Sequence, residues 1–359
     1  MFVGGEFYDD PQWLLEHLGL STNGMTFLNG GKACLMVITD YLLDHGVREV
    51  LLPSYLCPSI VDTLEQCGMA CVYYQVLPDF SIDLSDMARK AKTGQAVYFI
   101  NYFGFPHSEQ VRAFLLNVQQ EGMLLIEDNA QAGFTAQPIG DFVFNSLRKL
   151  APYDGGYLAT SLDVQPYVSA YSGTPNRRLP LIRDYRKRLV SYLFRGEDSY
   201  EALAELYRQA EAYYDSDAVV LGDAEERRQI ERLNWPEIRR RRRENYIYML
   251  ELIRDLPAIQ PVFPHLPDEV VPLGLPVYMN QGSRDALHDW LGEAGIGLTV
   301  HWHEILSDSR LNGNPTAVEI AAKIITLCID QRTSHKQMDF QEQMIREWVK
   351  QSSQRMISI

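Results

Sequence analysis

The sequence predicts an α/β fold in which helices flank a mostly parallel sheet, followed by a smaller α+β part. Short apolar runs alternate with helical stretches between about residues 30 and 160. These runs are continuously apolar, which is typical of strands covered by helices on both faces, and the alternation favours parallel pairing. A chain of 359 residues commonly forms two domains. We therefore expect a large domain at 1–235 and a small C-terminal domain at 236–359.

The expected elements follow in chain order. A helix over residues 32–45 presents Leu35, Ile38 and Leu42 on one face, and another covers 108–120. Later in the chain, long helix-rich segments are expected at 183–212 and 225–256, then a helix at 284–294 and two C-terminal helices. The expected extended runs are 49–52, 70–74, 96–100, 123–126, the alternating run that follows Gly140, 157–160, 270–279 and 297–301.

Composition limits the classes of function. The net charge is −14, so nucleic acid is not expected as the main partner. Five cysteines without a CxxC pair indicate free thiols in a reducing compartment. The acidic N-terminus does not resemble a signal peptide, and no apolar run reaches the length of a membrane span. These features predict a cytoplasmic protein that needs no membrane.

The first candidate feature is the segment LNGGKA, residues 28–33, which opens a helix. The glycine pair Gly30 and Gly31 lets the backbone approach a ligand closely. The helix start supplies free N–H donors and the positive end of the helix dipole, which together suit a phosphate. Many helices begin with glycine for turn reasons alone, and taken by itself this segment favours that structural interpretation.

The second feature is IEDNAQ, residues 126–131, where a hydrocarbon strand ends in two acids. Asp128 is thereby expected at the sheet edge where α/β proteins bind ligands. A carboxylate buried there needs a partner, because an unpaired buried charge is costly. The alternative is that Asp128 caps the following turn. The residues alone leave both interpretations open.

The third feature is the run NSLRK, residues 145–149, between an alternating strand and the glycine pair Gly155 and Gly156. A lysine in such apolar surroundings is unusual, because lysine normally lies in solvent. Desolvation or a cationic neighbour such as Arg148 would make Lys149 nucleophilic and able to form a Schiff base. A salt bridge from Lys149 to Asp141 or Asp154 is the alternative.

Together the three features supply the groups that pyridoxal 5'-phosphate (PLP) needs. This cofactor requires a lysine for its Schiff base, a carboxylate for the pyridinium nitrogen and donors for the phosphate. The carboxylate keeps the ring nitrogen protonated, so that the ring accepts electrons from a substrate carbanion. Lys149, Asp128 and the helix opened at Gly31 meet these requirements in order.

The sequence resembles the DegT/DnrJ-type sugar aminotransferases, which are PLP enzymes of fold type I. The matching stretches are NGGKACL, VLLPSYLCPSI, INYFGFP, IEDNAQAGF and GDFVFNSLRKLAPYDGG, with weaker similarity in RRRENYIYMLELI and GIGLTVHWHEI. The resemblance implies a seven-stranded, aspartate-aminotransferase-like PLP domain, a smaller C-terminal domain and a homodimer whose sites form at the subunit interface.

The resemblance also assigns roles to individual residues. Lys149 matches the Schiff-base lysine and Asp128 the acid that pairs with the pyridine nitrogen. Gln131 matches the residue beside the phenolic oxygen of the ring. Tyr55 matches an aromatic stacked on the ring, although an ordinary packed aromatic beside a proline-rich turn is nearly as good an interpretation. The phosphate is matched by backbone amides at the helix start and by a hydroxyl, from Gly31, Lys32, Ala33 and Ser146.

The chain departs from the commonest family pattern at two points. The Ser-to-Lys spacing in SLRK is shorter than in the frequent Ser-Phe-His-x-x-Lys run. The G-x-N-x-R stretch, which in the family sends an asparagine and an arginine across the dimer, is absent from the sequence. Arg177 or Arg178 is a candidate replacement for that cross-subunit phosphate contact.

The resemblance implies a PLP-dependent aminotransferase that moves an amino group, from glutamate, to a small-molecule keto substrate, a nucleotide-linked keto sugar in this family. A PLP lyase or dehydratase is the first alternative, but family dehydratases carry histidine in place of the lysine. A binding protein on the same fold that no longer turns over is the second. His301 and His303 flank Trp302 near the expected substrate pocket, and without a third ligand they predict no metal site.

Overall fold

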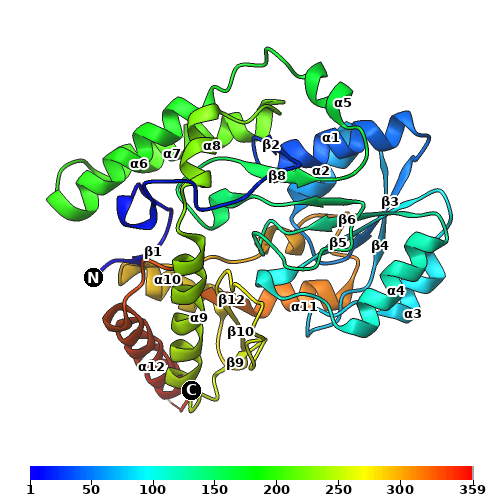
Figure 1. Cartoon of the computed structure of the whole chain (residues 1–359). Coiled ribbons are helices and arrows are strands. Elements are labelled where there is room, and N and C mark those ends of the chain that lie inside the picture. Colours follow the sequence, from blue (N-terminus) through cyan, green and yellow to red (C-terminus); the bar gives the residue numbers. More distant parts are fainter. Residues whose placement is uncertain (358–359) are drawn as a thin grey trace.

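The computed structural model describes residues 1–357 and is built around a seven-stranded sheet (Figure 1). The strand order is β2-β8-β7-β6-β5-β3-β4. β8 is antiparallel to both of its neighbours, and the other adjacent pairs are parallel. The predicted mostly parallel α/β sheet is therefore confirmed. Its strands are β2 (Met25–Leu28), β3 (Glu49–Pro53), β4 (Ala70–Tyr74), β5 (Ala96–Ile100), β6 (Leu124–Asp128), β7 (Phe142–Phe144) and β8 (Gly156–Ala159).

Helices cover both faces of this sheet, which explains why the central strands are continuously apolar. All five residues of β5 are buried. In Figure 1, α1, α2 and α5 lie above the sheet, and α3 and α4 lie below it. α1 also packs against α2 and α5. The bounds are α1 (Gly31–Asp44), α2 (Pro58–Gln66), α3 (Leu84–Lys90), α4 (Glu109–Gln120) and α5 (Gln165–Ala170).

The helix-rich segments expected at 183–212 and 225–256 each form two helices. α6 (Arg178–Arg195) ends at Gly196, whose φ of +66° is a left-handed conformation that suits glycine, and α7 (Tyr200–Ser216) packs back against α6. α8 (Ala224–Glu231) is separated from α9 (Trp235–Leu252) by the capping residue Asn234. The sequence shows the helical composition of these segments, and the capping residues set where they break.

A second, three-stranded antiparallel sheet has the order β12-β10-β9. Only the last five residues of the expected run 270–279 belong to it. The first residues of the chain reach this part of the molecule, because β1 pairs in parallel with β11. The strands and helices of this part of the molecule are β1 (Val3–Gly4), β9 (Ile259–Pro261), β10 (Leu275–Met279), α10 (Arg284–Glu293), β11 (Ile296–Gly297), α11 (Pro315–Lys323), β12 (Ile324–Leu327) and α12 (His335–Ile357).

α9 connects the two sheets along the chain, so a division into domains near residue 235 remains our prediction. Four short 3-10 helices complete the described elements: η1 (Pro11–Trp13), η2 (Tyr102–Gly104), η3 (Leu147–Lys149) and η4 (His303–Leu306). Over residues 1–357, the helices include none that combines the length and the apolar character needed to cross a membrane.

Candidate active site

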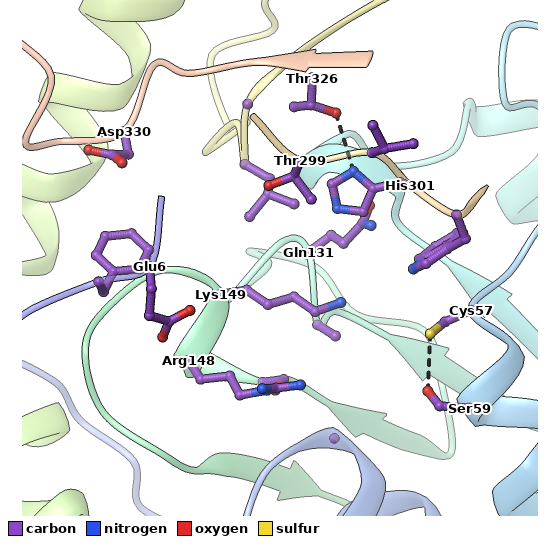
Figure 2. A pocket seen from close by; sticks show the side chains of 18 of the residues that line it. Glu6, Cys57, Ser59, Gln131, Arg148, Lys149, Thr299, His301, Thr326 and Asp330 are labelled. Atoms are coloured by element: carbon purple, nitrogen blue, oxygen red, sulfur yellow. Dashed lines mark hydrogen bonds between the residues drawn. The ribbon is translucent and has the colours of Figure 1, made fainter. Parts of the chain in front are cut away.

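A cavity of about 650 Å³ opens where the carboxyl ends of β5, β6 and β7 face the second sheet. This sheet edge is where open α/β folds bind ligands. One wall consists of the α1 start, the segment after β6 and the turn η3. The opposite wall combines residues 4–7, tyrosines of α6 and α7, and residues 297–302 and 326–330. Figure 2 shows side chains of both walls converging on the same space.

Lys149 extends into this cavity (Figure 2) from η3, which follows β7. Within the described part of the chain, its amine has no hydrogen bond or ion pair. Burial lowers the pKa of Lys149; Asp128 and Cys57 oppose that shift, and the adjacent Arg148 guanidinium adds to it. The amine is thus held closer to its neutral, nucleophilic form than a solvent-exposed lysine.

The alternative salt bridges proposed for Lys149 are not formed. Asp141 accepts a hydrogen bond from the backbone N–H of Leu125 at 2.7 Å. Asp154 is paired instead with two buried arginines, Arg186 at 2.9 Å and Arg178. Neither carboxylate is available to Lys149, so the structure favours the interpretation of this lysine as a reactive group.

Asp128 lies at the sheet edge and also caps the following turn, which are the two positions that the sequence left open. It is the last residue of β6, is buried and lines the cavity. Oδ1 accepts the N–H of Ala130 at 2.7 Å, which is the predicted cap, and Oδ2 accepts the Tyr98 hydroxyl at 2.6 Å. Burial raises the pKa of Asp128, while Lys149, Tyr98 and the Ala130 N–H lower it. A bound cation would stabilise this carboxylate in its charged form.

The start of α1 presents backbone donors to the same cavity. Gly30 is its N-cap with φ +108°, a conformation that favours glycine, and no side chain caps this helix end. Gly31 and Lys32 line the cavity, whereas Ala33 is buried in the first turn and does not. Ser146 also lines the cavity, is 4% exposed, and its hydroxyl has no hydrogen-bond partner among the described residues.

Gln131 and His301 add two oriented polar groups. The Gln131 Oε1 accepts the N–H of Phe103 at 2.7 Å, while its Nε2 is buried without a partner in the described structure. The His301 Nδ1 lies 3.2 Å from the Thr326 hydroxyl, as the dashed line in Figure 2 shows. Burial, and secondarily Lys149, lowers the pKa of His301 to about 3, so its imidazole is neutral.

The two histidines of the HWH segment have different surroundings. His301 lines the cavity, whereas His303 contacts Arg284 through Nδ1 at 3.0 Å. Across residues 1–357, no group of three or more His, Cys, Asp or Glu side chains is arranged to hold a metal. His303 thus makes a structural contact, whereas His301 faces the same space as Lys149.

Tyr55 requires a correction, because it does not line the cavity. Its side chain is fully buried among Phe80, Tyr102 and Trp302, and its hydroxyl donates to the carbonyl of His301. Cys57, two residues later, lines the cavity instead, with its Sγ 3.0 Å from the Ser59 hydroxyl (Figure 2). Sequence reasoning missed Cys57 because nothing in the run PSYLCPS shows which side chain turns inward.

Arg177 and Arg178 also lie outside the cavity lining. Arg177 pairs with Asp217, with Nε 2.9 Å from Oδ2, and stacks on Tyr213. Arg178 is 3% exposed and is committed to Asp154 and Glu211. Neither lines the cavity of its own chain, and a contact from either of them across a dimer stays a prediction. Arg148 does line the cavity, and the sequence marked it only as a neighbour of Lys149.

Comparisons with known proteins agree with this fold. No protein-family model matches the chain. A curated relative from Saccharopolyspora spinosa, a dTDP-4-dehydro-2,3,6-trideoxy-D-glucose 4-aminotransferase, is 31% identical over 153 residues, which cover 39% of this chain and 39% of the relative. The similarity thus spans about two fifths of that relative.

Solved structures match nearly the whole chain. The sugar aminotransferase CalS13 from Micromonospora echinospora aligns with a TM-score of 0.62 at 17% identity, covering 90% of this chain and 87% of that one. A DegT DnrJ EryC1 StrS aminotransferase from Brucella abortus aligns with a TM-score of 0.58 at 15% identity, covering 90% and 85%. Such identities show a shared fold, and the fold that the motif resemblance implies is confirmed.

Proposed function

We propose that this chain is a PLP-dependent aminotransferase that moves an amino group from glutamate to the keto group of a nucleotide-linked sugar. One observation carries the proposal. The amine of Lys149, with a lowered pKa and no hydrogen bond in the described structure, shares a cavity with the buried carboxylate of Asp128 at the strand ends. The curated relative, a transaminase of a nucleotide-linked keto sugar, supports the choice of substrate class.

The residues present fit PLP. The cavity holds three polar groups without hydrogen-bond partners in the described chain, namely the Lys149 amine, the Ser146 hydroxyl and the Gln131 Nε2. In our proposal these groups meet the cofactor carbonyl, phosphate and ring oxygen, in that order. Asp128 would pair with the ring nitrogen, and the amides at Gly31, Lys32 and Ala33 would add donors to the phosphate.

When bound, PLP supplies an electron sink that stabilises negative charge at the carbon carrying the amino group. Lys149, with its lowered pKa, is suited to take a proton from that carbon and to return it. The carboxylate of Asp128 is oriented by hydrogen bonds from the Tyr98 hydroxyl and the Ala130 N–H. The neutral His301, held by Thr326, offers its other ring nitrogen to the substrate side without adding charge.

The proposal includes a homodimer and a cytoplasmic location, with the large domain at 1–235 carrying the PLP site and the small one at 236–359. Asp128, Ser146 and Lys149, which are proposed to hold PLP, line the cavity and all lie within 1–235, which supports that placement of the site. Lys149 is the wrong residue for the dehydratase branch of the family. A binding protein without turnover is an outcome that the experiment below would detect.

The first test uses the purified protein with PLP and glutamate. We expect a visible absorption band that borohydride fixes as a mass increment on Lys149. Addition of glutamate should remove that band and form 2-oxoglutarate in an amount equal to the protein sites. Lys149→Ala should lower the rate of this half-reaction by at least roughly a thousandfold, since it loses both the nucleophile and the base.

Matched results separate the alternatives. Lys90→Ala, which alters a partly exposed lysine that is paired with Asp86 and lies outside the cavity lining, should leave the half-reaction unchanged. An adduct on Lys149 that glutamate does not alter would contradict glutamate as the donor. A protein that forms no adduct on Lys149 would contradict the aminotransferase proposal itself.

A further inference from the structure

We propose that Arg148 is a phosphate ligand of PLP, so that the guanidinium at the phosphate comes from the same chain and the same turn as Lys149. This inference rests on the proposed function and extends it, since the phosphate was assigned above only to backbone amides and a serine hydroxyl. Figure 2 shows Arg148 and Lys149 extending from one short turn into the cavity.

The position of Arg148 is fixed beside the start of α1 by Tyr214. The guanidinium lies over the Tyr214 ring at 4.2 Å. Lys32, in the first turn of α1, donates to the Tyr214 carbonyl at 3.0 Å and lies 5.8 Å from the same ring. One tyrosine of α7 therefore holds Arg148 and the α1 start on the same side of the cavity.

Arg148 retains donors for an anion. Its only hydrogen bond in the described structure is a long one, from Nη1 to the Glu211 Oε2 at 3.4 Å. Glu211 is shared, because Arg178 donates to its Oε1 from Nε at 3.2 Å and from Nη2 at 2.7 Å. The Nε and Nη2 of Arg148 thus have no partner among the described residues. A planar guanidinium with two free donors matches a phosphate dianion.

Two further observations point to an anion at the same place. The buried Ser146 hydroxyl lacks a partner in the described structure, and this residue begins the turn that carries Arg148. A Cβ added to Gly30 would lie 3.5 Å from the Ser146 Oγ, so the hydroxyl stands directly beside the uncapped end of α1. Helix amides, a hydroxyl and a guanidinium then converge on one site.

The other arginine of the cavity lining is committed elsewhere. Arg242 donates from Nε to Gln331 at 2.8 Å and from Nη1 to the carbonyls of Pro272 and Leu273. It therefore belongs to the wall formed by the second sheet. Among the cavity-lining residues that the structure describes, Arg148 is the arginine next to the α1 start.

The test compares PLP with pyridoxal, which lacks the phosphate, on the apoprotein of the wild type and of Arg148→Gln. Dissociation constants are measured by equilibrium dialysis of each ligand, which does not require the Lys149 adduct. We expect Arg148→Gln to weaken PLP binding by roughly ten- to hundredfold, as for loss of a hydrogen bond to a charged group. Loss of the Arg148 charge also alters the pKa of Lys149, and this effect is the same for both ligands. Once it is corrected for, the affinity for pyridoxal should equal that of the wild type. Arg148→Lys should recover part of the PLP affinity.

Arg227→Gln is the matched control, because Arg227 also donates to a carboxylate, that of Glu231 at 2.8 Å, but lies outside the cavity lining. It should leave both affinities unchanged. Equal weakening of PLP and pyridoxal by Arg148→Gln would overturn the inference, as would unchanged PLP affinity with a raised KM for glutamate. An absent Lys149 adduct in the wild type would instead contradict the proposed function, and the ratio of PLP to pyridoxal affinity would still report on Arg148.

Discussion

The two walls of the cavity are built in different ways. The strand-end wall comprises the α1 start, residues 128–131 and residues 146–149, all at the edge of one sheet and fixed by local bonds such as Asp128 to Ala130. The distal wall combines residues 4–7, Tyr185 and Tyr207 of the α6–α7 pair, and residues 297–302 and 326–330. The position of this wall depends on strand pairing between residues far apart in the chain, as between Val3 and Ile296.

Under the proposed function, this difference separates chemistry from substrate choice. The groups proposed to exchange protons or to bind the cofactor sit on the strand-end wall, where a single sheet fixes their spacing. The distal wall is anchored through α6, whose buried Arg178 and Arg186 reach Asp154 in the core. Changes at the anchor should therefore affect stability, whereas changes on the strand-end wall should affect the reaction. The predictions below test that separation.

The largest effect is expected for Asp154→Asn, which removes the carboxylate that holds α6, and with it the distal wall, in place. The substitution leaves Arg178 and Arg186, which are 3% and 1% exposed, without their shared carboxylate. Removing one partner from a buried ion pair costs about 3 kcal/mol of folding stability. Thermal unfolding followed by circular dichroism should show a clear fall in Tm.

Asp141→Asn provides the matched comparison for that measurement. Asp141 accepts a backbone N–H from Leu125, and an asparagine oxygen can accept the same bond. We expect it to cost less than about 1 kcal/mol. Equal losses of stability for the two variants would contradict the idea that Asp154 anchors α6.

The next effect is expected for Asp128→Asn, on the strand-end wall. Loss of the charge opposite the cofactor ring should lower kcat by roughly a hundredfold. Burial raises the pKa of Asp128 in the folded protein, so its ionisation as the pH rises lowers folding stability, and a neutral asparagine does not carry this cost. The Tm of the protein without cofactor should therefore not fall. A large fall would mean that Asp128, like Asp154, is chiefly structural.

The same contrast explains what the sequence could predict. Asp128 was identifiable because it ends the strand β6, and Lys149 because it lies in the short turn that follows β7; the carboxyl ends of such strands meet at one sheet edge. The pairing of β1 with β11 has no local signal, since it joins segments almost 300 residues apart in the chain. Arg148 was recognised as a charge, but its proposed role depends on contact with Tyr214 of α7, a helix that packs back against α6 after the break at Gly196.

The smallest effect distinguishes two residues of the loop after β3, where the sequence favoured Tyr55 as the ring contact and the structure presents Cys57 to the cavity. Tyr55→Phe removes a buried hydroxyl that donates to the His301 carbonyl, so it should cost about 1 kcal/mol of stability and leave PLP affinity unchanged. Cys57→Ala removes a cavity-facing atom and should weaken PLP binding by a few fold with little change in Tm. The dissociation constant of PLP and the Tm of each variant decide between the two. If Tyr55→Phe weakened PLP binding while Cys57→Ala did not, the loop would face the cavity in the way that the sequence resemblance implied, and the boundary of the strand-end wall would have to be redrawn to include Tyr55.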